Sequence, residues 1–175
     1  MNDFAERGLQ PTEPIEATHQ IKATASDLWA VISARGNLMN IHPFCSRNPV
    51  ERWPGIDGVD HVHYYGGVHY RREVSRWCEG EGYELLVGPP SGQIAKARWW
   101  IQPTSINECN FGIEVVSYVR SDADPESRAK YEQKMINEAI PPYLRAVVKG
   151  VAHFAETGDP VQRNQFGPHD IYSPG

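Results

Sequence analysis

Residues 60–74 read DHVHYYGGVHYRREV, and this stretch sets the pattern for the middle of the chain. Two segments with alternating side chains flank a Gly-Gly pair, which is typical of two strands joined by a tight turn. No helix start follows the glycines, so the pair indicates a hairpin and not a phosphate-binding loop. Three histidines, three tyrosines, two arginines and a glutamate make the hairpin unusually polar. Its two faces must therefore present different chemistry.

Upstream of the hairpin, the sequence predicts a strand followed by two short helices. Residues 15–23 (IEATHQIKA) alternate between apolar and polar side chains, as in a strand with one buried face, and His19 lies on that otherwise apolar face. Thr24 and Asp27 have the spacing of a helix N-cap. A shorter helical piece, NLMNIH, ends at Pro43.

Downstream, turn signals separate short alternating segments between residues 48 and 119, which indicates an antiparallel meander. A long helix is expected after Asp124, where an N-cap residue precedes a proline. Its apolar stripe continues across Pro141-Pro142, so the sequence predicts one helix kinked there. We expect residues 14–157 to form one ligand-binding domain, residues 1–13 a flexible N-terminal tail, and residues 158–175 an extended C-terminal tail.

Composition excludes several classes of partner. The 175 residues include 17 basic and 22 acidic side chains, a net charge of −5, and no block of Lys or Arg, which argues against nucleic acid binding. No run of eighteen apolar residues or secretory signal is present, so no membrane insertion is expected. The three cysteines form no CxxC pair, which favours a reduced, cytoplasmic protein. Nothing in the sequence indicates a cofactor.

Four stretches together resemble a known superfamily. They are ATASDLWAVISARGNLMNIHPF, GVDHVHYYGGVHYRREVSRW, VVSYV and the late helix. In this order they resemble the START/SRPBCC superfamily, which includes polyketide cyclases/aromatases, lipid-transfer domains and abscisic-acid-type hormone receptors. The resemblance implies an α+β helix-grip fold. In it, a curved antiparallel sheet of about six to seven strands wraps around a long C-terminal helix, two short helices follow the first strand, and a ligand cavity lies between sheet and helix.

The resemblance also implies which face of the hairpin lines that cavity. In the hormone receptors the glutamate that matches Glu73 faces the ligand, and the hairpin register then turns Arg71, His61 and His63 inward. These four residues are the predicted catalytic groups. The histidines and Glu73 would handle protons, and Arg71 would hold an anionic oxygen. On this assignment the alternate residues of the hairpin, Tyr64, Tyr70 and Arg72, point away from the cavity, and His69 lies at its rim.

A second set of residues is expected to contact the ligand without reacting with it. The set combines a polar strand residue, two residues of the turn that roofs the pocket, the tyrosine before the Gly-Gly pair, one of two adjacent tryptophans, a glutamate of the last strand and two residues of the helical stripe. They are His19, His42, Cys45, Tyr65, Trp99, Glu114, Tyr143 and Val147.

Other interpretations of these residues compete with the catalytic roles. The HxH pair could chelate a metal, but the positions where a cupin places its glutamate hold Gly67 and Val68, so we favour histidines on a hydrated strand face and predict no metal. Cys45 near His42 could form a nucleophilic pair, although a buried, inert cysteine is the favoured reading. Arg71 and Glu73 could equally be a structural ion pair.

The sequence therefore supports two main functions. The first is an enzyme of the polyketide cyclase/aromatase type, which binds a hydrophobic or aromatic, polyketide-like small molecule and assists a cyclisation, dehydration or related proton transfer. The alternative is a non-catalytic carrier or sensor of a hydrophobic ligand. In a third reading the C-terminal tail docks a partner or a second subunit, giving a homodimer.

Overall fold

The central hairpin forms as predicted. In the computed structural model, which describes residues 4–175, β5 (Val59–Tyr64) pairs antiparallel with β6 (His69–Cys78). Gly67 has a φ of +87° at the turn, a conformation that favours glycine.

The elements that precede the hairpin are β1 (Leu9–Pro11), β2 (Ile15–Ile21), α1 (Ala25–Ile32), α2 (Leu38–Ile41), β3 (Cys45–Arg47) and β4 (Val50–Arg52). The strands that follow it are β7 (Gly82–Gly88), β8 (Ala95–Ser105) and β9 (Glu108–Arg120). The hydroxyl of Thr24 accepts the Asp27 N–H, so the predicted cap of α1 is confirmed.

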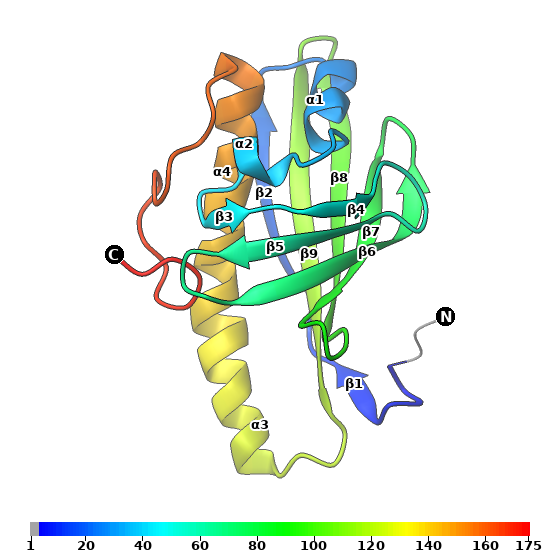
Figure 1. Ribbon diagram of the computed structural model, residues 1–175, viewed down its shortest axis with the longest axis vertical. Helices are drawn as coiled ribbons and strands as arrows, with labels where there is room; N and C mark the ends of the chain where they lie inside the picture. The colour runs from blue at the N-terminus through cyan, green and yellow to red at the C-terminus, as the bar shows by residue number, and fades with distance from the viewer. Residues whose placement is uncertain (1–3) are drawn as a thin grey trace.

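Within residues 4–175 the strands form one nine-stranded antiparallel sheet in the order β1-β9-β8-β7-β6-β5-β3. The strand β2 also pairs with β9, and β4 also pairs with β5. Figure 1 shows the sheet curved around the long C-terminal helix. The six longer strands match the expected number, and β1, β3 and β4 are three-residue additions. The fold is therefore the predicted helix grip, with the two short helices after the second strand because β1 precedes them.

The C-terminal helix is continuous in path but not uniform. It runs through α3 (Pro125–Tyr131), a π-helical segment η1 (Glu132–Ala139) and α4 (Ile140–Thr157). Pro141 and Pro142 lie in the first turn of α4, where a missing backbone N–H is tolerated best. The π-helical turns before the proline pair continue the helix without a break. Gly158 ends α4 in the left-handed conformation, with φ 77°.

Close packing between α2 and α4 fixes how these two helices lie against each other. A Cβ added at Gly150 would lie 2.1 Å from the carbonyl oxygen of Ile41, so only glycine lets α2 rest on α4 here. The adjoining apolar core is made of residues that α4 and the concave sheet face bury together. Among them are Ile21, Leu85, Phe111, Leu144, Val148 and Val151.

Both ends of the chain pack on the domain. In place of the flexible tail expected at residues 1–13, β1 pairs with β9, and Phe4 stacks on Tyr118 with ring centroids 3.8 Å apart. Residues 1–3 lie outside the described residues. The C-terminal residues 158–175, predicted as an extended tail, contain two turns and fold back along α2 and the hairpin turn. None of the helices in residues 4–175 is long and apolar enough to cross a lipid bilayer.

Candidate functional site

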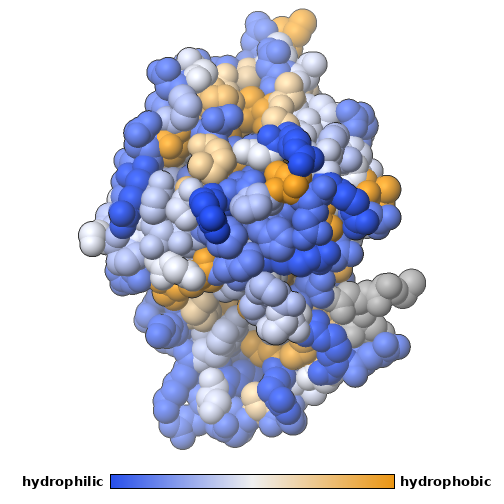
Figure 2. Space-filling view, viewed as in Figure 1, coloured by the Kyte–Doolittle hydropathy of each residue, from blue (hydrophilic) through white to orange (hydrophobic). Residues whose placement is uncertain are grey.

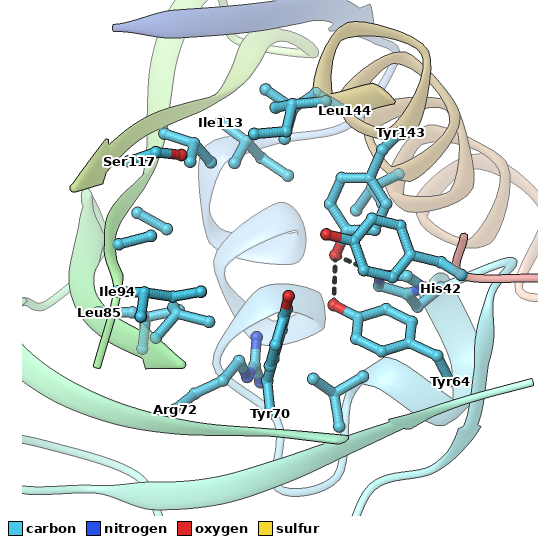
Figure 3. A pocket seen from close by; sticks show the side chains of 18 of the residues that line it. His42, Tyr64, Tyr70, Arg72, Leu85, Ile94, Ile113, Ser117, Tyr143 and Leu144 are labelled. Carbon is cyan, nitrogen blue, oxygen red and sulfur yellow. Dashed lines mark hydrogen bonds between the residues drawn. The ribbon is translucent and has the colours of Figure 1, made fainter. Parts of the chain in front are cut away.

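A cavity of about 100 Å³ lies between the concave face of the sheet and the C-terminal helix. Its wall is mainly apolar and includes Leu38, Val62, Leu85, Ile113, Leu144 and Val147. The polar side chains of the wall are His42, Tyr64, Tyr70, Arg72, Ser117, Tyr131, Tyr143 and Tyr172. Figure 3 shows several of these polar groups converging from one side, opposite an apolar wall.

Two tyrosines and a histidine form a hydrogen-bonded chain at this polar side (Figure 3). The hydroxyl of Tyr143, from α4, lies 2.8 Å from the hydroxyl of Tyr64, from β5. The Nε2 atom of His42, which follows α2, lies 3.0 Å from the same Tyr143 oxygen. Three separate elements thus bring these groups together.

Backbone geometry fixes where the proton of His42 resides. The N–H of Phe44 donates to His42 Nδ1 over 3.1 Å, so Nδ1 is an acceptor. A neutral imidazole then carries its proton on Nε2 and donates it to Tyr143. Both ring nitrogens of His42 are therefore engaged within the protein.

Burial keeps all three groups uncharged. Burial, together with the positive charge of Arg72, lowers the pKa of His42 to about 3. Burial raises the pKa of both Tyr64 and Tyr143 well above the ordinary tyrosine value. At neutral pH the cluster therefore presents hydrogen-bond donors and no charge of its own.

A buried ion pair supplies the charge beside this cluster. Arg72 of β6 donates from Nε to Asp60 over 2.7 Å and from Nη2 to the second carboxylate oxygen over 2.5 Å. Burial acts to lower the pKa of the guanidinium, but Asp60 raises it above its ordinary value. Asn48 also donates to Asp60, which holds the carboxylate in place behind the cavity wall. Arg72 itself lines the cavity.

The predicted catalytic residues lie on the opposite face of the hairpin, so their predicted orientation is wrong. His61, His63, Arg71 and Glu73 are absent from the cavity wall, and the residues between them in sequence form it. Glu73 accepts from Arg71 over 2.5 Å on the outer surface. Figure 2 shows that this face of the molecule is predominantly hydrophilic over β5 and β6. The reason is that Val62, Tyr64, Tyr70 and Val74 are the more apolar set, and the core takes that set.

The three histidines of the hairpin contact one another on this outer face. His61 Nδ1 lies 3.0 Å from His69 Nε2, and the rings of His63 and His69 stack with centroids 4.0 Å apart. Glu51 accepts from His61 over 2.6 Å, and this bond lowers the pKa of Glu51. His69 is thus on the outer face and not at the cavity rim. Within residues 4–175, no group of three or more histidine, cysteine or acidic side chains is arranged to hold a metal.

The predicted ligand contacts divide into two groups. His42, Trp99, Tyr143 and Val147 all lie in the cavity wall. The other four, His19, Cys45, Tyr65 and Glu114, do not contribute to it.

Each of those four has a different surrounding. Cys45 is buried in β3, where its thiol donates to the carbonyl of Arg47, and burial raises its pKa to about 12, which keeps the thiol protonated at neutral pH. Tyr65 is 42% exposed at the hairpin turn. Glu114 faces outward, 3.8 Å from Arg98. His19 is partly buried on β2, outside the cavity wall.

Tyr64, Tyr70, Arg72 and Tyr172 are among the polar wall residues that were not identified from the sequence. For the first three a signal existed, because they share the face of Val62 and Val74. For Tyr172 there was none, since nothing in an extended Pro/Gly-rich tail indicates where it docks.

Comparisons with known proteins agree with this geometry at the level of the fold. No family model matches the chain, and a sequence search finds no match among curated proteins. Norcoclaurine synthase from Thalictrum flavum, in complex with dopamine and hydroxybenzaldehyde, matches with a TM-score of 0.64 at 12% identity, over 88% of this chain and 91% of that one.

Two further solved structures show the same similarity. The di-domain ARO/CYC protein BexL matches with a TM-score of 0.63 at 12% identity, over 81% of this chain and 46% of that one. A protein of unknown function from Staphylococcus aureus matches with a TM-score of 0.64 at 11% identity, over 83% of this chain and 96% of that one. The predicted resemblance to helix-grip proteins is therefore confirmed for the fold, and at these identities it extends no further.

Proposed function

We propose that the cavity binds a small aromatic molecule through a carbonyl or phenol oxygen, and that it polarises this oxygen during a cyclisation, dehydration or related proton transfer. The observation that carries the proposal is the hydrogen-bonded pair of tyrosine hydroxyls inside a mainly apolar cavity. Such donors are most effective where water is excluded and negative charge develops on an oxygen.

The proton count of the pair leaves one donor for a ligand. Tyr64 and Tyr143 bring two O–H groups, and the bond between them uses one. His42 already supplies its own N–H to Tyr143. One hydroxyl proton is thus left to donate to a ligand oxygen, whichever tyrosine donates to the other.

Arg72 adds positive charge at the same place. Its two bonds to Asp60 use Nε and Nη2 and hold the guanidinium plane fixed. The remaining Nη1 donors belong to a side chain in the cavity wall. A ligand oxygen that gains negative charge would be stabilised by this group as well as by the tyrosines.

The size of the cavity limits a ligand to at most one ring. An engineered protein cavity of ~150 Å³ takes up one benzene molecule, and the volume here is about 100 Å³. Extended polyketides would need a larger space. The aromatic compounds named with the norcoclaurine synthase structure, dopamine and hydroxybenzaldehyde, each carry one ring and support this size class.

A non-catalytic carrier or sensor is the second candidate. No carboxylate lines the described cavity wall, and both nitrogens of His42 are engaged. The cavity therefore offers strong donors but no evident base, which suits binding without turnover.

One experiment tests binding and polarisation together. The carbonyl stretch of 4-hydroxybenzaldehyde is recorded by infrared difference spectroscopy with the wild-type protein, Tyr143→Phe and Tyr65→Phe. We expect the stretch to move to lower frequency on binding, and the shift to shrink in Tyr143→Phe with an affinity loss of about threefold to tenfold. Tyr65→Phe makes the same change at an exposed tyrosine and should behave as wild type. If the aldehyde does not bind, or binds with an unshifted carbonyl, the proposal is wrong.

A second measurement separates the enzyme from the carrier. Exchange of the methyl protons of 4-hydroxyacetophenone for deuterium is followed by NMR. An enzyme that stabilises the enolate accelerates exchange above the buffer rate, and Tyr143→Phe reduces the acceleration. A carrier binds the ketone and leaves the exchange rate unchanged.

A further inference from the structure

We infer that the C-terminal strap, residues 158–175, is part of the binding site and that its Tyr172 determines which ligands fit. This inference rests on the proposed function, because it concerns the same cavity. Tyr172 is the one strap residue in the cavity wall. The strap is anchored at three places.

Backbone hydrogen bonds hold the first part of the strap against the start of the domain. The N–H of Val161 donates to the carbonyl of Asn40 over 2.9 Å, and that of Asn164 donates to Pro43 over 3.0 Å. Both acceptors lie next to His42, so the strap passes directly beside the polar end of the cavity.

The second anchor is the hairpin turn. The N–H of Gly66 donates to the carbonyl of Tyr172 over 2.8 Å. A Cβ at Gly66 would lie 2.2 Å from the carbonyl oxygen of Ile171. Any residue larger than glycine at this position would therefore clash with the strap. The positive φ that the turn itself needs belongs to Gly67, around which a Cβ would meet nothing within 4 Å. The two glycines therefore have separate tasks: Gly67 makes the turn, and Gly66 receives the strap.

His169 is the third anchor and joins the strap to the helix. Its Nδ1 accepts from the N–H groups of Ile171 and Tyr172, over 3.3 and 3.2 Å. Its Nε2 then carries the proton and donates to the carbonyl of Ala139 over 2.9 Å, where η1 gives way to α4. The imidazole is only 6% exposed, so these bonds are shielded from water.

These anchors place the ring of Tyr172 against the reactive cluster. The ring centroid lies 4.5 Å from that of Tyr64 and 4.8 Å from that of Tyr143. Tyr172 is 5% exposed, and its side chain is hydrogen-bonded to Tyr70. The strap thus fills space on the side of the cavity where the ligand oxygen would bind, and it limits the ligand to one ring.

The test compares a one-ring probe, phenol, with a two-ring probe, 2-naphthol, by isothermal titration calorimetry. We expect the wild-type protein to bind phenol at least tenfold more tightly than 2-naphthol. Tyr172→Ala removes the ring and leaves the strap backbone in place, and Gly66→Ala displaces the strap. Each should shift the ratio of the two affinities towards 2-naphthol by tenfold or more. Gly67→Ala is the matched control, because it strains the same turn without touching the strap, and it should keep the wild-type ratio.

The outcomes distinguish the two proposals. If the wild type binds phenol and the ratio stays unchanged in both Tyr172→Ala and Gly66→Ala, the role of the strap is refuted while the proposed function stands. If the wild type binds neither probe, the cavity is no binding site and both fall. Near-ultraviolet circular dichroism of each variant checks the fold, and Tyr172→Phe, which keeps the ring, should retain the wild-type ratio.

Discussion

The two faces of the β5–β6 hairpin carry similar side chains in very different surroundings. On the inner face, Asp60 and Arg72 form an ion pair with side chains 2% and 6% exposed. On the outer face, Arg71 and Glu73 form a pair at about the same distance, but their side chains are 30% and 33% exposed. Arg72 lies between Arg71 and Glu73 on β6, so consecutive residues of one strand contribute to both pairs.

The two pairs differ in their exposure to solvent and not in residue type, and this exposure determines how much each charge depends on its partner. Inside, each charge must be matched because water cannot replace a lost partner. Outside, water and salt screen the same interaction. The histidines follow this rule too: His42 is held neutral by burial, whereas His61 contacts Glu51, which is open to solvent.

The largest effect should come from breaking the inner ion pair. Asp60→Asn leaves the guanidinium of Arg72 buried without a countercharge, and we expect a loss of about 3–5 kcal/mol in the free energy of unfolding. Glu73→Gln, the matching change on the outer face, should cost less than about 1 kcal/mol. Urea unfolding at pH 7 measures both. Equal losses would mean that burial does not distinguish the two pairs.

A smaller effect should appear in the pH dependence of stability. The pKa of His42 falls from 6.5 to about 3 on folding, so between these values the unfolded chain binds a proton that the folded protein does not. The contribution of His42 to the free energy of unfolding is therefore fully present above pH 6.5 and is lost as the pH falls towards 3. Between pH 6.5 and 5 the loss should be ~2 kcal/mol, at 1.36 kcal/mol per pH unit.

His42→Gln should remove that contribution, since glutamine does not titrate. The measurement is the unfolding free energy of wild type and variant at pH 7 and pH 5. The gap between the two pH values should be narrower in the variant. His63→Gln, on the outer face, should narrow the gap by less, because burial and the neighbouring charges lower the pKa of His63 too but the side chain stays partly exposed. An equal effect from both variants would contradict the contrast between the faces.

The smallest effect is expected from the outer histidines. His61→Ala and His63→Ala should change stability by no more than about 0.5 kcal/mol, since their surroundings are hydrated. Binding of 4-hydroxybenzaldehyde and exchange of 4-hydroxyacetophenone should both stay at wild-type levels. Loss of turnover in either variant would instead restore the catalytic role that the sequence predicted for these histidines.

The predicted orientation came from the resemblance, which turned the glutamate matching Glu73 towards the ligand, and the geometry of β6 explains why alternation along the strand gives conflicting signals. Trp77 packs inward, with its ring centroid 5.4 Å from that of Tyr83. Glu73 is four residues before Trp77, so a strand with regular alternation would turn both side chains inward. The pairing of β6 with β7 shifts register between Val74 and Arg76, and this irregularity reverses the alternation. The apolar residues before the shift carried the correct signal.

Local chemistry in the sequence was enough to predict the elements of this protein. The cap at Thr24, the Gly-Gly turn and the period-two strands each depend on neighbours in the chain, so sequence alone determined α1, the longer strands and their order, but not the three-residue strands β1, β3 and β4. The helix-grip fold was implied by the resemblance to a known superfamily, which itself rested on that order.

Tertiary structure decided everything that depends on which groups lose their water. It chose the inner face of the hairpin, paired Asp60 with Arg72, joined His42 to Tyr143, and brought Tyr172 from the end of the chain into the cavity wall. These contacts join residues far apart in the sequence, or depend on a single register shift. Their energies come from desolvation and close packing, which no local pattern encodes.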